Sequence, residues 1–343
     1  MSDGCKIERI TQTELRKLLG EQGETVFTRY KQARDLVVDQ VLPEIKAVQP
    51  ALTDHGPKHV RDVLEKAHAL LGKNCIGNGR RQLNAVEAYC LLLCVIFHDV
   101  GNIYGRDGHQ HHVASVYDYV HSEASRDMQE KQIILTVAGA HCGEASDGSK
   151  DTLRQLGGDA WLLGQRVRMR DVSAILRLAD ELAEGPQRTS TFMRKLGYPP
   201  DAQVYHEYAR ATRTSVDQPS GRIALDYHIE VECDGGKQTA PQKKALKDFL
   251  CFIEQRALKV DQEMRYASFY SPLLREFRST SITMGFWIDG NLADLDLQPV
   301  VLTDLVVPGT KGKLPSEIDS KYSYRSLASA IARYLSRRKG GAK

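Results

Sequence analysis

One apolar run constrains the fold of this chain more than any other stretch. Leu91–Phe97 carries no charged residue and ends abruptly in His98-Asp99, with Gly101 two residues later. A helix without a polar face must be buried on all sides, so the run predicts a helix in the centre of a core. An isolated carboxylate is very costly to bury, so Asp99 needs a hydrogen bond, an ion pair or a metal ion. The simplest interpretation is a His-Asp pair that caps a helix end.

Composition excludes several other classes of protein. The chain has 343 residues, 41% of them hydrophobic, and a formal net charge of +3, which does not favour nucleic-acid binding by the whole molecule. Its seven cysteines form no Cys-x-x-Cys pair. This argues against a disulfide framework or a zinc ribbon and predicts a reducing, cytoplasmic location. We expect no signal peptide, and we expect no apolar run long enough to span a membrane.

A second informative stretch precedes the apolar run. Pro57 suits the first turn of a predicted helix that ends near residue 71, and His59 lies on the apolar side of that helix. His55 stands just before it. A single inward-facing His is more often a core residue than a ligand, so neither residue is informative alone.

Three later segments repeat the pattern. His111 and His112 belong to a histidine-rich tract that opens a predicted helix, although such a tract can also lie in solvent. His141 ends another apolar helix, and Asp180 continues the apolar stripe of a further one. A mid-helix Asp beside such a stripe needs a partner, as Asp99 does.

Taken together, five helices each deliver a His or Asp near a buried face. This pattern predicts a cluster of imidazole and carboxylate ligands in a helical bundle, where facing helices build metal sites. A nitrogen and oxygen ligand set without thiolate suits Mn, Fe, Co, Ni or Zn rather than a structural zinc site.

The order His59, His98-Asp99, Asp180 resembles the HD superfamily of metal-dependent phosphohydrolases over roughly residues 50–190. The resemblance implies that these four residues hold a first divalent ion. It also implies that His141 and either His111 or His112 hold a second ion, with Asp99 as the bridge. Mg is a further candidate for the two ions.

Three groups within this superfamily can be compared with the chain. In the related cyclic-nucleotide phosphodiesterases a His one turn before the first ligand is the general acid, and His55 matches that place. The HD-GYP branch has Lys where Asn102 stands and a Gly-Tyr-Pro tripeptide that is absent here, so cyclic dinucleotide specificity is not implied. The start at Thr53 and the helix at Asp180 look closer to HD domains of conflict or defence systems, including those joined to Hsp90-like ATPases.

The resulting functional hypothesis is a phosphohydrolase or phosphodiesterase that acts on a nucleotide or short oligonucleotide. Arg106, Arg188 and Lys195 are candidates for binding phosphate oxygens, although solvated surface charge explains each equally well. One alternative is a nucleotide-sensing or signalling module with little or no turnover. A second is an all-α scaffold with hydrogen-bonded core histidines. A homodimer and a partner protein from a defence operon are left open.

The predicted fold is mainly α: an HD-type helical bundle with a small hairpin or sheet region in the C-terminal half. We expect an N-terminal helical segment at 1–49, the HD core at 50–197 and an α/β extension at 198–343. Within the extension, alternation predicts strands at Val204–Thr214 and Arg222–Val231. A long amphipathic helix is expected at Lys244–Phe269.

Overall fold

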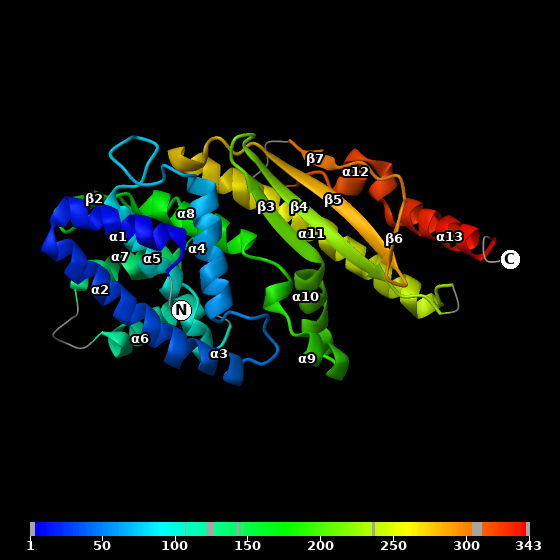
Figure 1. Ribbon diagram of the computed structural model, residues 1–343, viewed down its shortest axis with the longest axis horizontal. Helices are drawn as coiled ribbons and strands as arrows, with labels where there is room; N and C mark the ends of the chain where they lie inside the picture. The colour runs from blue at the N-terminus through cyan, green and yellow to red at the C-terminus, as the bar shows by residue number, and fades with distance from the viewer. Residues whose placement is uncertain are drawn as a thin grey trace. The chain divides into compact units, whose positions relative to one another are not determined.

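The computed structural model describes residues 4–106, 108–121, 127–141, 144–145, 147–234, 237–303 and 311–340. The chain forms two compact units (Figure 1). The first contains residues 1–183 and 266–276, and the second contains residues 184–265 and 277–343. The expected parts 1–49, 50–197 and 198–343 stay a prediction. The prediction of a mainly α fold with a small sheet in the C-terminal half is confirmed.

The centre of the first unit is α5 (Ala85–Phe97), in which every residue is buried. Its first turn is fixed by a capping box: the backbone N–H of Glu87 donates to Asn84 Oδ1, and the N–H of Asn84 donates to the Glu87 carboxylate. By length and composition Ala85–Tyr104 could cross a bilayer, which corrects the expectation that no run is long enough. Here 94% of its apolar window is buried inside the protein, as befits a core helix.

Other helices of the first unit pack around α5. They share one buried apolar face and one polar face, as amphipathic surface helices do. The helices that contact α5 are α1 (Lys6–Leu19), α2 (Glu21–Leu36), α4 (Pro57–Leu71), α7 (Met128–Gly139) and α8 (Met169–Leu182). A short hairpin, β1 (Ala160–Leu162) with β2 (Gln165–Val167), precedes α8.

Pro43 reshapes the helix that follows α2. The sequence predicts a kink or a split there, and the structure has a π-helical turn at Val37–Val41, named η1, followed by α3 (Leu42–Val48) with Pro43 in its first turn. Proline lacks the N–H that would bind a carbonyl one turn back, so the ladder shifts in register rather than continuing. Both η1 and α3 pack against the 3-10 turn η2 (Val100–Tyr104), which directly follows Asp99.

An ion pair holds α5 and α8 side by side in parallel. Arg168, the N-cap of α8, donates from Nε to Glu87 Oε1 at 2.7 Å and from Nη2 to Oε2 at 2.6 Å. Eleven residues separate Glu87 from His98 and twelve separate Arg168 from Asp180, or about 17 and 18 Å of helix. The ion pair joins the N-terminal ends of the two parallel helices, and His98 and Asp180 follow it at nearly equal distances along them. The two residues therefore come together at the C-terminal ends of α5 and α8.

The second unit contains a five-stranded sheet with the order β3-β4-β5-β6, in which β7 also pairs with β5. The hairpin partners are β3 (Thr212–Asp217) and β4 (Arg222–Val231), and β4 runs parallel to β5. The remaining strands are β5 (Ser279–Ile288), β6 (Asn291–Ala293) and β7 (Val300–Leu302). Alternate residues of β4 and β5 are buried, as expected for a sheet with one covered face.

One helix of the second unit lies where the sequence predicted a strand. The predicted strand Val204–Thr214 is helical up to Ala211, because Pro200 opens α10 (Pro200–Ala211) and Ala202, His206 and Ala209 recur at helical spacing on its buried face. The predicted helix Lys244–Phe269 is present as α11, whose last residues belong to the first unit. Helix α11 spans Ala240–Tyr270, and the other helices of this unit are α9 (Thr191–Leu196), α12 (Pro315–Ile318) and α13 (Tyr324–Gly340).

Candidate metal centre

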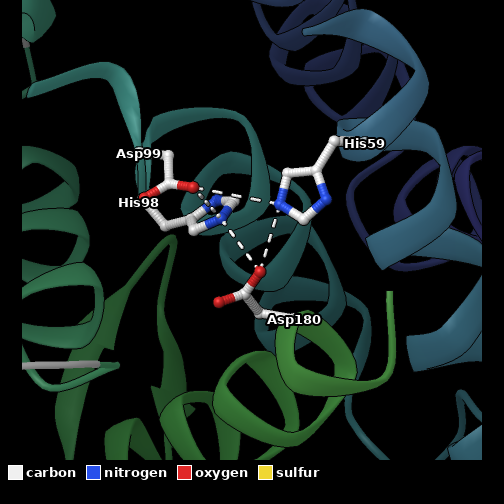
Figure 2. Close-up of side chains that lie close together, drawn as sticks. All are labelled: His59, His98, Asp99 and Asp180. Carbon is white, nitrogen blue, oxygen red and sulfur yellow. Dashed lines mark ion pairs between the residues drawn. The ribbon is translucent and has the colours of Figure 1, made fainter. Parts of the chain in front are cut away.

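Three helices bring the first group of candidate ligands together. His59 lies in the first turn of α4, after Gly56 and Pro57 have set the helix start, and it is 1% exposed. His98 ends α5, and Asp180 lies in the last turn of α8. Figure 2 shows the two imidazole rings directed at the carboxylates of Asp99 and Asp180. The four residues named by the sequence analysis therefore meet in one place.

Asp99 lies directly after the end of α5, and its carboxylate faces the histidines of the first group. Its backbone has φ −108° and ψ 0°, in the sparsely populated bridge region where the α-helical path ends. Its Oδ2 lies 3.3 Å from Nε2 of His98 and 3.9 Å from Nε2 of His59. The same two imidazole nitrogens lie 3.6 and 3.1 Å from Oδ1 of Asp180.

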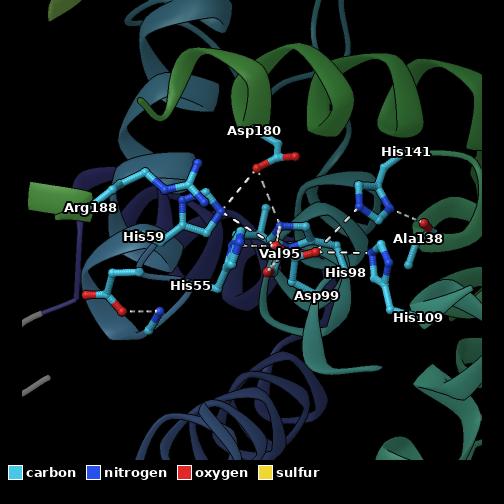
Figure 3. A network of polar contacts seen from close by, with 12 residues as sticks. His55, His59, Val95, His98, Asp99, His109, Ala138, His141, Asp180 and Arg188 are labelled. Carbon is cyan, nitrogen blue, oxygen red and sulfur yellow. Dashed lines mark hydrogen bonds and ion pairs between the residues drawn. The ribbon is translucent and has the colours of Figure 1, made fainter. Parts of the chain in front are cut away.

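A second group shares the other oxygen of Asp99. Oδ1 lies 3.2 Å from Nε2 of His109 and 3.8 Å from Nε2 of His141. Figure 3 shows these two imidazoles on one side of Asp99 and His59 on the other. Within each group the candidate ligand atoms all lie within 4.8 Å of one another. Two ligand groups thus meet at a single carboxylate.

In the structure His109 lies beside Asp99 and His141, whereas the sequence named His111 or His112 for that group. The tract His109–His112 forms a 3-10 turn, η3, in which His109 is buried while His111 and His112 are exposed. His112 stacks on the ring of Tyr104 instead, at 4.7 Å between centroids. The three histidines lie within four residues, and only the packing of the turn separates the buried His109 from its exposed neighbours.

Gly101 is the sequence signal that could have identified His109. A Cβ atom built on Gly101 would lie 1.8 Å from the carbonyl oxygen of His109. The backbones of η2 and η3 can therefore approach each other only if residue 101 has no side chain. This close approach brings the start of η3, and with it His109, up to Asp99.

Three of the imidazoles are held in the same way. Nδ1 of His98 donates to the carbonyl of Val95 at 2.8 Å, and Nδ1 of His109 donates to the carbonyl of Arg106 at 3.0 Å. His141 makes the equivalent bond to Ala138. In each case the acceptor is the carbonyl three residues earlier. These bonds fix the tautomer and direct Nε2 into the cluster, as the outer partners of metal-binding histidines do.

The charges in the cluster require cations. Burial alone would lower the pKa of His98, but Asp99 and Asp180 raise it well above its usual range. Burial alone would raise the pKa of Asp99 and of Asp180, but the facing histidines lower both well below the usual range. A neutral imidazole with Nδ1 as donor would direct its Nε2 lone pair at a carboxylate oxygen. The arrangement therefore needs either protons or metal ions between these atoms.

The donor set fits divalent metal ions. Imidazole nitrogen and carboxylate oxygen bind such ions at about 2.0–2.2 Å, so ligands of one ion lie within roughly 4.4 Å of each other. The spacing within each group is close to this limit. The side chain of Asp180 is 27% exposed whereas that of Asp99 is 8% exposed, so the first group has a route to solvent beside Asp180.

His55 lies against the first group, with Arg106 beside it. Its Nδ1 is 3.2 Å from Oδ2 of Asp99, and its Nε2 is 3.4 Å from Nη1 of the exposed Arg106. The ring of His55 is edge-on to that of His59 at 5.4 Å. The structure thus brings the predicted general acid into contact with the shared carboxylate.

The two other predicted phosphate-binding residues belong to the second unit. Arg188 is buried, and its Nη1 lies 3.7 Å from Oε2 of Glu184 in the same unit. Lys195 lies in α9, but its side chain is outside the part of the chain that the structure describes.

Comparison with protein families identifies the family of this chain. The family model HD-CE matches residues 49–259, which is more than half of the chain. No curated protein matches the chain. The matched range includes both candidate ligand groups and His55.

Proposed function

Because the chain belongs to the HD-CE family, we propose that its two ligand groups bind two divalent cations and that it is a metal-dependent phosphohydrolase or phosphodiesterase. The observation that carries the proposal is the position of Asp99, whose two oxygens face separate groups of imidazoles. A carboxylate shared in this way suits two ions that lie close together, as in two-metal hydrolases.

The residues of the two ligand groups would have different roles in the reaction. When bound, divalent cations lower the pKa of water to near neutrality and neutralise charge on a phosphate. Asp99 would hold the two ligand groups at a fixed separation. The backbone bonds of His98, His109 and His141 keep the imidazoles in place before a substrate arrives. Little reorganisation is then needed during the reaction.

We propose His55 as the proton donor to the leaving oxygen. Its Nδ1 faces Asp99, so Nε2 is the atom that can deliver a proton. Arg106 Nη1 can only donate, so Nε2 would carry the transferred proton once Arg106 binds a phosphate oxygen in place of His55. A substrate phosphate held by Arg106 would place its ester oxygen close to His55. Arg188 and Lys195 stay predictions as further phosphate-binding residues.

The proposed substrate is a nucleotide or a short oligonucleotide, in keeping with the HD-type resemblance. A partner protein from a defence operon stays a proposal on the same basis. Substrate class and metal can be tested together by incubating the purified protein with Mn, Fe, Co, Ni, Zn or Mg and a panel of phosphate esters. We expect product release with at least one nucleotide class.

The decisive variant is Asp99→Asn, with metal content as the second measurement. We expect both ions and all turnover to be lost, because the remaining amide cannot bridge two cations. Retention of full metal content would overturn the assignment. Binding of metal and nucleotide by the unmodified protein without any turnover would instead support the sensing module.

A further inference from the structure

Asn102 is a buried amide whose side-chain hydrogen bonds are not made. The residue is 0% exposed, and neither Nδ2 nor Oδ1 has a hydrogen-bond partner among the described residues. Its backbone, by contrast, is fully used: the N–H donates to Asp99 O at 3.0 Å and the carbonyl accepts from Gly105 N–H at 3.1 Å. The backbone is therefore held firmly while the side chain is left unsatisfied.

The 3-10 geometry places this amide on the side of Asp99. Residues three apart in a 3-10 turn lie on one face, and the bond from Asn102 to the Asp99 carbonyl is of this type. Asn102 also follows Gly101, whose backbone touches His109. The buried amide thus belongs to the turn that joins Asp99 to η3, the segment that delivers His109.

An amide in this state needs a partner in the working protein. Burying a polar group without a hydrogen bond destabilises the folded protein, and Asn102 has two such atoms. An apolar side chain would avoid that cost. Because the residue is fully buried, that partner is not bulk solvent but a group held inside the protein.

We infer that Asn102 is a positioning residue that hydrogen-bonds a water molecule of a hydrated divalent cation in the second group. This inference rests on the proposed function. Asp99, His109 and His141 offer three ligand atoms, fewer than the four to six or so that such cations take. Water completes the set, and an amide can both accept a hydrogen bond from that water and donate one to a neighbouring oxygen.

The test compares Asn102→Leu with the unmodified protein by Mn²⁺ titration calorimetry and by thermal unfolding with and without a chelator. Loss of an outer partner lowers metal affinity by about 10–100-fold, and we expect that loss for one of two Mn²⁺ ions. The chelated variant should unfold at the same temperature or a higher one, because no unsatisfied amide remains. Asn102→Asp, which keeps an acceptor in the same place, should restore most of the affinity.

A matched control is Thr280→Val in β5 of the second unit. Thr280 is also fully buried with an unsatisfied Oγ1, and it belongs to the other unit, so its replacement removes the same kind of defect from an element that supplies no candidate ligand. We expect unchanged Mn²⁺ affinity in this control. Two ions bound with unchanged affinity by Asn102→Leu would overturn the inference alone, whereas no Mn²⁺ bound by the unmodified protein would overturn the proposed function itself. If Asn102→Leu does not fold, unchanged affinity in Asn102→Ala, which has no side-chain donor or acceptor, overturns the inference equally.

Discussion

At the scale of single residues, His55 is the clearest case of a side chain that should act in chemistry without holding a metal ion. We expect His55→Ala to keep its metal content but to lose about 10²–10⁴-fold in kcat. The loss should be much smaller for a nitrophenyl ester, whose leaving group needs little protonation. Equal losses on good and poor leaving groups, or loss of metal, would remove His55 from the reaction.

His109 and His111 offer a matched pair in one turn. His109→Ala should lower bound metal from two ions to one, because His141 and Asp99 alone make a weak site. His111→Ala removes an exposed imidazole two residues away and should leave metal content unchanged. Metal analysis of both purified variants checks this, and a reversed order would restore the assignment that the sequence suggested.

Gly101 is expected to control the same group through the backbone. Gly101→Ala puts a methyl group against the carbonyl of His109, so η2 and η3 must separate. The variant should still fold but should lose the second ion, with little effect on the first. A crystal structure of the Mn²⁺-soaked variant with His109 still at Asp99 would contradict this expectation.

At the scale of elements, the site depends on the parallel register of α5 and α8. Arg168→Met leaves the Glu87 carboxylate, whose side chain is 1% exposed, without its main cation. We expect a loss of roughly 3 kcal/mol in unfolding free energy, with weaker metal binding because Asp180 shifts along α8. Denaturant unfolding measures the first effect and metal titration the second.

The double variant Glu87→Gln with Arg168→Met is the control for this ion pair. It removes both charges, so it should recover most of the lost stability. Register would then rest on side-chain packing alone, and we expect metal affinity to recover less than stability. Full recovery of both would show that the ion pair stabilises the helices without setting their register.

At the scale of the whole molecule, we expect stability to fall in acid partly through Glu8. Burial alone would raise the Glu8 pKa, but hydrogen bonds from Tyr30, Arg34 and the Cys5 N–H lower it below the usual value. A carboxyl whose pKa is lowered by folding stabilises the protein above its unfolded pKa of about 4.3. That contribution is lost as pH falls through the folded pKa.

Unfolding free energies measured between pH 3 and pH 7 check this expectation. Glu8→Gln should be less stable than the unmodified protein at pH 7, and its stability should depend less on pH in the acid range. Glu65→Gln, at an exposed position on α4, is the control and should follow the unmodified protein. An equal acid dependence in Glu8→Gln and the unmodified protein would exclude Glu8 as a contributor.

Local features of the sequence were enough to predict the core helix and five candidate ligands of the two groups. Leu91–Phe97 has no polar face, so its burial follows from composition alone. His59 and Asp180 lie on apolar helix faces that the periodicity of their own segments defines. Such features need no knowledge of distant parts of the chain.

Where the local sequence fits more than one residue or secondary structure equally well, the tertiary structure determines which one is found. Three histidines share one short turn, and packing of that turn against Gly101 selects His109. Likewise, the apolar alternation in Val204–Ala211 fits either a strand or a helix, and packing in the second unit favours the helix. The burial of Asn102 beside Asp99 also emerges only when η2 and η3 meet. In each case several residues are locally equivalent, and contacts between distant segments supply the free energy that separates them.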